Sequence, residues 1–197
     1  LRCSGTTFDK DSLPGKLLNM LTLSVSMFAH ALFLLRAGDV ALVVTNPPVL
    51  PFLVLFACLA RRARCAVIVH DVYPETLVAA GLLRAGSWPA RLLNGLNRWL
   101  YRRAAVVTVL GRDMERLVLK KLAIEESDRV FVVPNWADDL RPASRESSAL
   151  LKDLGLETAF VVQYAGNMGR NHGIESPFET ADRLNQRERD VHFLFIG

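Results

Sequence analysis

Residues 65–70 carry the sequence CAVIVH, a short apolar run that decides the fold class of this chain. A run that is apolar on both faces is typical of a strand buried in a parallel sheet. Similar β-branched runs occur at 40–45 (VALVVT), 105–110 (AVVTVL) and 129–133 (RVFVV). Helical patterns separate them, so the sequence predicts an α/β domain with a parallel sheet. The helices are expected at 12–35, at about 49–62, at 74–103 with breaks at Gly86 and Pro89, and at 112–122.

A polar stretch with prolines, residues 134–148, indicates a connection between two domains. Beyond it, a helix at about 147–154 precedes strands at 159–164 and 191–196, which enclose a glycine-bearing loop and a further helix. A single βαβ unit cannot bury its own core. We therefore expect two domains, at 1–141 and 142–197, with the second one incomplete.

The charge of the chain is distributed unevenly. Residues 1–121 hold 16 Lys and Arg against 7 Asp and Glu, a balance of +9, and residues 122–197 hold 8 against 13, a balance of −5, which together give the net +4. A basic half favours contact with an anionic membrane, a phosphate-bearing lipid or nucleic acid, and a solvated basic surface is the alternative. No nucleic-acid-binding motif accompanies the charge, so we expect no nucleic-acid partner.

Three cysteines, Cys3, Cys58 and Cys65, have no metal-ligand spacing, and this usage is typical of a reducing cytoplasm. Two uncharged runs were compared with membrane spans. The run at 40–60 is broken by three prolines, which favours a strand, a turn and a buried helix. The run at 17–35 has the length of a span but carries polar side chains, so a buried or membrane-lying helix is the favoured interpretation.

Residues 164–175 (YAGNMGRNHGIE) are the strongest local signal for chemistry. Three glycines follow a strand and precede a helix, where backbone N–H groups and the helix dipole can hold a phosphate. Arg170 and His172 add side chains that can contact a diphosphate. The spacing matches neither the dinucleotide fingerprint nor the P-loop. An ordinary strand-to-helix turn that needs glycine is the alternative.

The segment VHDVYPE at 69–75 places His70 and Asp71 at the carboxyl end of a predicted strand, where open α/β sheets bind ligands. Either side chain could act as a base or hydrogen-bond partner, and His70 could equally be a core histidine. Glu75 stands in a first helical turn, where the helix dipole alone favours an acid. Asn46 ends another strand on the same edge. Several strand ends therefore converge on one predicted crevice.

Five motifs then follow one another in a characteristic order: TNPP at 45–48, VIVHDVYPE at 67–75, AAVVTVLGRDM at 104–114, VFVVPNW at 130–136 and YAGNMGRNHGIE at 164–175. This series resembles the retaining glycosyltransferases of family 4, which have the GT-B fold. It is most similar to the bacterial exopolysaccharide and O-antigen branch, related to colanic-acid and fucosamine glycosyltransferases. The resemblance covers the chain from about residue 40 to residue 197.

The resemblance implies a GT-B-like pair of Rossmann-like domains, both incomplete. It also implies transfer of a hexosyl group from a nucleotide-sugar to a lipid-linked or glycan acceptor in cell-surface polysaccharide synthesis. The enzyme would retain anomeric configuration, need no metal or other cofactor, and contact the inner face of the bacterial cytoplasmic membrane peripherally. His70 and Asp71 would face the transferred sugar, and Asn46 and Glu75 would lie on the acceptor side. The donor diphosphate would contact Gly166, Asn167, Gly169, Arg170, His172 and Gly173.

Two departures from the family pattern matter. Asn167 and His172 stand where the family pattern has Arg and Lys, so Arg170 is the expected source of positive charge. The family's paired-Glu motif and its first βα unit are not found, so we expect a fragment that does not turn over by itself. The alternative functions are a non-catalytic acceptor-binding or membrane-docking subunit that needs a separate donor domain, or an inactive truncated product.

Overall fold

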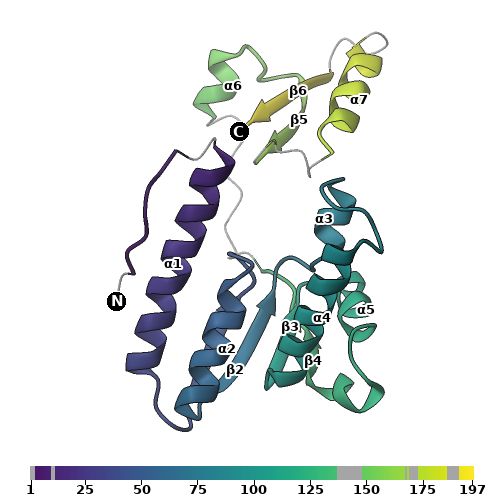
Figure 1. Cartoon of the computed structure of the whole chain (residues 1–197). Helices are drawn as coiled ribbons and strands as arrows, with labels where there is room; N and C mark the ends of the chain where they lie inside the picture. Colours follow the sequence, from purple (N-terminus) through teal and green to yellow (C-terminus); the bar gives the residue numbers. More distant parts are fainter. Residues whose placement is uncertain (1–2, 10–11, 137–147, 167, 169–172, 186–190) are drawn as a thin grey trace. The chain divides into compact units, whose positions relative to one another are not determined.

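The computed structural model describes residues 3–9, 12–136, 148–166, 168, 173–185 and 191–197 (Figure 1). The chain divides into two compact units, Leu1–Asn135 and Trp136–Gly197. The expected domain boundary between residues 141 and 142 falls in the stretch 137–147, which lies outside the described residues. Each unit is described by itself.

The first unit is a parallel α/β unit. Its sheet has four strands in the order β1-β2-β3-β4, and all neighbouring pairs are parallel. Because each strand pairs with the next one along the chain, every connection is a crossover, as the alternating pattern predicts. The strands are β1 (Val40–Val44), β2 (Arg64–Val69), β3 (Val106–Val109) and β4 (Val130–Val132).

Most helices of this unit begin and end close to the expected positions, but the one expected from residue 74 to Gly86 ends already at Ala79. The helices are α1 (Leu13–Leu34), α2 (Leu50–Arg61), α3 (Glu75–Ala79), α4 (Trp88–Arg103), α5 (Arg112–Leu119) and the 3-10 helix η1 (Ile124–Arg129). A second expectation is wrong in detail, because Pro89 does not interrupt a helix. It lies in the first turn of α4, where a missing N–H breaks no hydrogen bond. The interruption spans residues 80–87, from the C-cap of α3 at Ala80 to the N-cap of α4 at Ser87, and both Gly81 and Gly86 within it adopt a positive φ, 69° and 74°.

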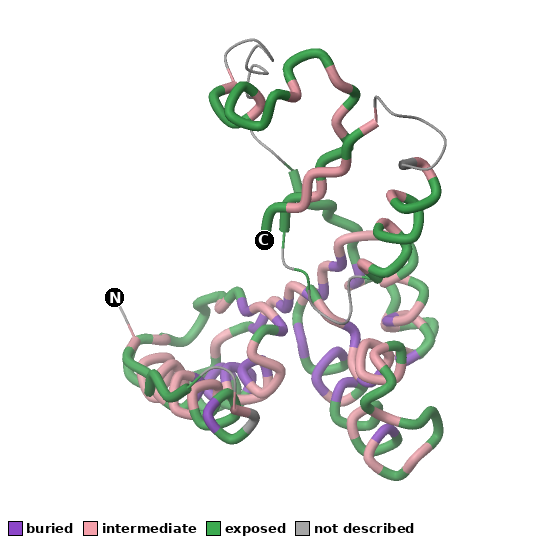
Figure 2. Tube along the Cα trace, turned by 90° about the horizontal axis from the view of Figure 1, so that it is seen from above, coloured by how far each residue is buried: buried purple, intermediate pink, exposed green. Residues whose placement is uncertain are grey.

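The core lies between the sheet and the helices that cover it. Alternate strand residues Val67, Val69, Val107 and Val109 are fully buried, and they pack with Leu55 of α2 and with Leu100 and Tyr101 of α4. Figure 2 shows these buried positions concentrated in the first unit. The β-branched strands and the two helices thus form one contiguous hydrophobic core.

Helix α1 packs along α2 (Figure 1), and few of its described residues are buried. Ser12 caps its first turn by accepting a hydrogen bond from Gly15 N, and Ser24 is fully buried. Over Pro14–Leu34 its mean hydropathy of 1.7 gives it the length and composition of a membrane span, with 6% of the window buried. The core helix of a soluble protein or a signal sequence can have the same length and hydropathy, so this finding alone does not make α1 a membrane span.

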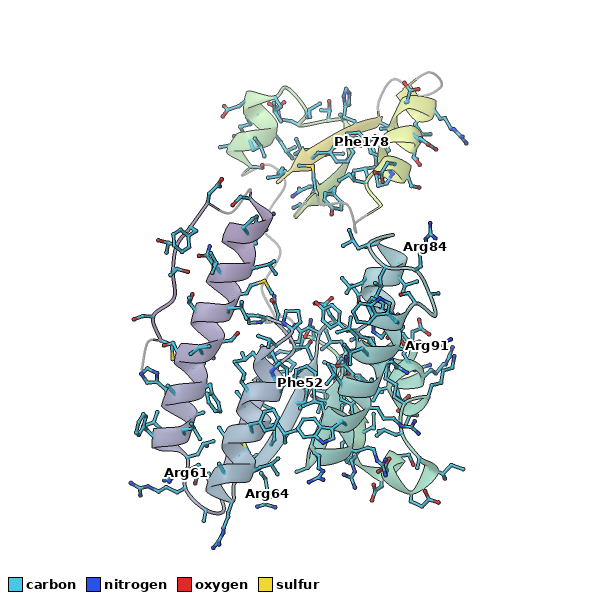
Figure 3. All side chains as sticks on the ribbon, viewed as in Figure 1. Phe52, Arg61, Arg64, Arg84, Arg91 and Phe178 are labelled. Carbon is cyan, nitrogen blue, oxygen red and sulfur yellow. The ribbon has the colours of Figure 1, made fainter. Side chains whose placement is uncertain are left out.

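The second unit contains α6 (Ala149–Asp153), β5 (Phe160–Ala165), α7 (Glu175–Asn185) and β6 (Val191–Ile196). β5 and β6 pair in parallel over six residues. Phe178 of α7 stacks on Phe195 of β6 with ring centroids 4.3 Å apart (Figure 3). None of the described residues of this unit is buried. This confirms the expectation that one βαβ unit cannot bury its own core.

Candidate active site

The candidate site begins where β1 and β2 end at one edge of the sheet. Thr45 follows β1, and its side chain is almost completely buried, at 2% exposure. Its Oγ1 accepts hydrogen bonds from His70 N at 3.0 Å and from Asp71 N at 3.1 Å. One buried hydroxyl therefore holds the backbone of both predicted catalytic residues against the end of the neighbouring strand.

The side chains at this edge differ in exposure. His70 and Asn46 are exposed, and Asp71 is half-buried. Burial, with a further contribution from the Asp71 carboxylate, raises the pKa of Tyr73 above its ordinary value. The edge combines an accessible imidazole with a half-buried carboxylate, and the roles of His70 and Asp71 stay predictions.

Glu75 begins α3 five residues after His70, and it is paired rather than free. Lys121 Nζ donates to Glu75 Oε1 and to Asn94 Oδ1, each at 2.6 Å, and Lys121 is only 4% exposed. Pairing of this kind is required when a charged group is buried. Lys121, two residues after the end of α5, is thus tied to α3 by an ion pair and to α4 by a hydrogen bond.

Neither Lys121 nor Asn94 was expected from the sequence. Lys121 stands in a Lys-Lys pair next to a strongly amphipathic helix, a pattern typical of a solvated face, and no motif marks it. Only the crossover that brings the end of α5 beside α3 places the two side chains together. No sequence signal could have found this contact.

Two of the cavities beside these helices matter for the site. The first, of about 460 Å³, is lined by residues of α3, of the following loop and of α4: Pro74, Glu75, Val78, Ala79, Ala85, Gly86, Ala90, Arg91 and Asn94. The second, of about 670 Å³, is an apolar groove between α2 and α4, lined by Pro48, Val49, Phe52, Leu53, Phe56, Leu93, Leu96 and Trp99. We call them the α3–α4 pocket and the α2–α4 groove. Phe52 is labelled in Figure 3.

The glycine-bearing loop of the second unit is described only at its ends. Gly166 follows β5 with φ 153°, and its N–H donates to Ile196 O at 2.9 Å. Gly173 has φ 58° and precedes α7. Both angles favour glycine, and a Cβ at either position would meet nothing within 4 Å, so backbone conformation is the reason for glycine here. The other predicted donor residues, Asn167, Gly169, Arg170 and His172, lie outside the described residues.

No group of three or more His, Cys, Asp or Glu side chains able to hold a metal ion occurs within the part of the chain that the structure describes. The expectation that no metal or cofactor takes part stays a prediction.

Comparison with curated proteins identifies two bacterial relatives. WbjE of Pseudomonas aeruginosa, named as a probable glycosyltransferase, is 35% identical over 164 residues, which is 82% of this chain and 40% of WbjE. WcaI of Escherichia coli (strain K12), whose name assigns it to colanic acid biosynthesis, is 27% identical over 141 residues, or 68% of this chain and 34% of WcaI. The chain thus spans about two fifths or less of the length of these relatives.

Solved structures of HepE from Anabaena are similar in fold. The complex of HepE with UDP-glucose matches with a TM-score of 0.56 at 16% identity, over 94% of this chain and 54% of HepE. The complex with UDP and glucose matches with a TM-score of 0.60 at 14% identity, over 94% of this chain and 53% of HepE. At this level of identity the likeness concerns the fold, which is a partial GT-B fold with mixed α/β units and parallel sheets.

A match to a protein family covers most of the first unit. Residues 9–136 match the glycosyl transferase 4-like domain, and this range contains Thr45, the His70–Asp71 edge and the Lys121–Glu75 pair. The expected resemblance is confirmed by this match together with the two bacterial relatives and the HepE fold. The chain therefore belongs to the glycosyl transferase 4-like family.

Proposed function

We propose that the protein is a retaining glycosyltransferase that moves a hexosyl group from a nucleotide-sugar to a membrane-associated glycan or lipid-linked acceptor in cell-surface polysaccharide synthesis. The observation that carries the proposal is the family match over residues 9–136, which includes the strand-end edge with His70 and Asp71. The HepE complexes hold UDP-glucose or UDP with glucose, which supports a nucleotide-sugar as the donor.

The proposed chemistry divides between the two units. The costly event is departure of a nucleoside diphosphate, whose developing negative charge is stabilised by fixed N–H donors and a cation. The loop between Gly166 and Gly173 supplies N–H groups ahead of α7, and Arg170 supplies the cation. His70 or Asp71 faces the transferred sugar, and positioning of the acceptor hydroxyl provides much of the remaining rate enhancement. No metal or cofactor is needed for these steps.

The acceptor side is proposed to meet the inner face of the cytoplasmic membrane peripherally. The first unit supplies both components of such contact. Residues 1–121 carry a balance of +9, and arginines cluster at the end of α4 and around the end of α2, where Figure 3 labels Arg61 and Arg64. The α2–α4 groove adds an apolar surface, with Leu96 and Phe56 of its lining 41% and 51% exposed. Basic and apolar surfaces together favour anionic lipid interfaces.

This chain spans about two fifths of the length of WbjE. The donor half of the proposal is therefore tested by calorimetry on the protein made from its complete coding sequence. UDP-glucose is the first ligand to titrate, followed by other nucleotide-sugars. We expect Arg170→Ala to weaken donor binding at least tenfold, since a charge-assisted hydrogen bond to a phosphate is lost. Arg183→Ala, on α7, is the matched control. Unchanged affinity in Arg170→Ala would remove Arg170 from the donor site.

A further inference from the structure

The α3–α4 pocket has the size of a small-molecule site and a largely apolar lining with a few polar residues. Its volume of about 460 Å³ falls in the lower part of the range of small-molecule pockets. One wall is made of small or apolar side chains, including Ala79, Ala85 and Ala90, which leave room for the C–H face of a ring. Three polar residues, Glu75, Arg91 and Asn94, complete the lining. Pro74 also lines it, so the pocket begins four residues after His70 in the chain.

Lys121 determines what the polar wall offers to a ligand. An ammonium can only donate, so its contact with Asn94 fixes Oδ1 toward Lys121 and leaves the Nδ2 donors of Asn94 available. Its contact with Glu75 uses Oε1, and Glu75 Oε2 is a buried oxygen without a hydrogen-bond partner among the described residues. The amide of the exposed Asn94 is therefore the donor that this wall offers to a ligand.

The charge balance of the pocket favours an anion. The charge of Glu75 is offset by Lys121, which lies 2.6 Å away. Arg91 is exposed and takes part in no ion pair among the residues that the structure describes. Figure 3 shows Arg84 and Arg91 projecting on the same side of the first unit. The pocket therefore presents an uncompensated guanidinium beside a fixed amide donor.

From these observations we propose that the α3–α4 pocket binds a pyranose that carries an anionic group, with Arg91 contacting the anion and the Asn94 amide contacting a ring oxygen substituent. The anion is the carboxylate of a uronic acid or the phosphate of a sugar phosphate. Lys121 is a positioning residue that orients Asn94 and Glu75. Assignment of this sugar to the acceptor rests on the transferase function proposed above, whereas binding of the sugar to this chain does not.

Calorimetric or NMR titration of the 197-residue chain tests the proposal, with glucuronate, glucose 1-phosphate and glucose as probes. We expect at least one anionic sugar to bind saturably and about fivefold more tightly than glucose, the contrast that one exposed charge contact supplies. Glucuronate and glucose 1-phosphate distinguish the carboxylate from the phosphate. Equal affinity for all three probes, or no saturable binding of either anionic sugar, would overturn the proposal.

Two substitutions locate the binding. Arg91→Gln is expected to remove the preference for the anionic sugar, and Ala85→Phe, in an exposed loop, is expected to abolish binding by filling the pocket. Arg98→Gln is the matched control, because Arg98 is an exposed arginine of α4 that lines a different cavity. All three sites are exposed, so the fold should be retained, and circular dichroism verifies this. Binding that is unaffected by both Arg91→Gln and Ala85→Phe would exclude the pocket.

The two proposals fail separately. If the complete protein binds no nucleotide-sugar while the pocket still binds an anionic sugar, the transferase function is wrong and the pocket remains. If transfer activity is present but Arg91→Gln changes neither sugar binding nor the KM for the acceptor, the pocket proposal is wrong and the transferase function remains.

Discussion

Thr45 Oγ1 accepts a hydrogen bond of 3.0 Å from the backbone N–H of His70, 25 residues further along the chain. The same oxygen accepts the N–H of Asp71, so a single side chain at the end of β1 determines where the end of β2 leaves the sheet. A buried backbone N–H without an acceptor is costly. The placement of the predicted catalytic residues therefore depends on Thr45, which has no proposed role in catalysis.

Thr45→Val removes this acceptor while keeping the shape of the side chain. We expect it to lower the free energy of unfolding by about 1–3 kcal/mol, because two N–H groups lose their partner. Urea denaturation followed by tryptophan fluorescence measures the change. Thr45→Ser keeps the hydroxyl and should retain most of the stability. Equal losses in the two variants would show that the methyl group, and not the hydroxyl, is the important part.

Asp71→Asn tests the charge at the strand end. Because the Asp71 carboxylate contributes to the raised pKa of Tyr73, its neutralisation should lower that pKa toward the ordinary value, although burial keeps it raised. Absorbance titration of the phenol, compared with Tyr73→Phe to assign the signal, measures the shift. In the complete protein, whichever of His70→Ala and Asp71→Asn reduces kcat by about 10²–10⁴ identifies the residue that acts on the sugar.

Lys121→Met leaves the Glu75 carboxylate without its cation. Breaking a buried ion pair by removing one partner typically costs about 3–5 kcal/mol, and a loss at the lower end is expected here because Glu75 is 36% exposed. The double variant Lys121→Met with Glu75→Gln should recover part of this loss, since no unpaired charge remains. A double variant less stable than Lys121→Met alone would contradict a role of the Glu75 charge in the single variant.

The buried thiols of Cys58 and Cys65 predict a loss of stability at alkaline pH. Burial, reinforced by the neighbouring Cys58, raises the pKa of Cys65 from 9.0 to about 12. Unfolding restores the lower value, so the unfolded chain binds fewer protons between pH 9 and 12 and stability falls as pH rises through this window. The contribution is fully present below pH 9.

Because of this thiol, the free energy of unfolding is expected to fall by about 1.4 kcal/mol for each pH unit within this window. Cys65→Ala should reduce the slope measured by urea denaturation between pH 9 and 11, whatever its effect on stability at pH 7. Cys3→Ser, at a partly exposed position, is the control and should leave the slope unchanged. An identical slope in Cys65→Ala and in the parent chain would argue against a raised pKa.

Membrane contact is tested by flotation with vesicles that contain anionic lipid. We expect binding that high salt releases, because it depends on the basic surface of the first unit. Phe56→Gln, in the α2–α4 groove, should weaken binding further, and Leu82→Gln, at an exposed position outside the groove, is the control. Retention after both high salt and alkaline carbonate would indicate instead that α1 inserts.

Much of the fold follows from local patterns. The β-branched runs at 40–45 and 65–70 became β1 and β2 within one residue at each end, because β-branched side chains favour strands and prolines or polar residues follow the runs. Burial on both faces is not found in β1, where Val43 is buried and Leu42 is exposed. The prediction that Pro89 interrupts a helix is wrong. A proline breaks a helix interior but fits a first turn, and only the position of the N-cap at Ser87 shows that Pro89 lies in a first turn. The 3-10 helix η1 was missed because its polar sequence lacks any apolar period.

The sequence by itself determined the order of strands and helices, the parallel sheet, the carboxyl edge with His70 and Asp71, and the family, since these follow from hydrophobic periodicity and from residues adjacent in the chain. The tertiary structure alone decided that Thr45 holds His70, that Lys121 pairs with Glu75, and that α3 and α4 line a pocket beside Arg91, which has no ion-pair partner among the described residues. The physical reason is distance along the chain. Contacts between residues 25 to 46 positions apart depend on how the crossovers pack, and no local pattern encodes that packing.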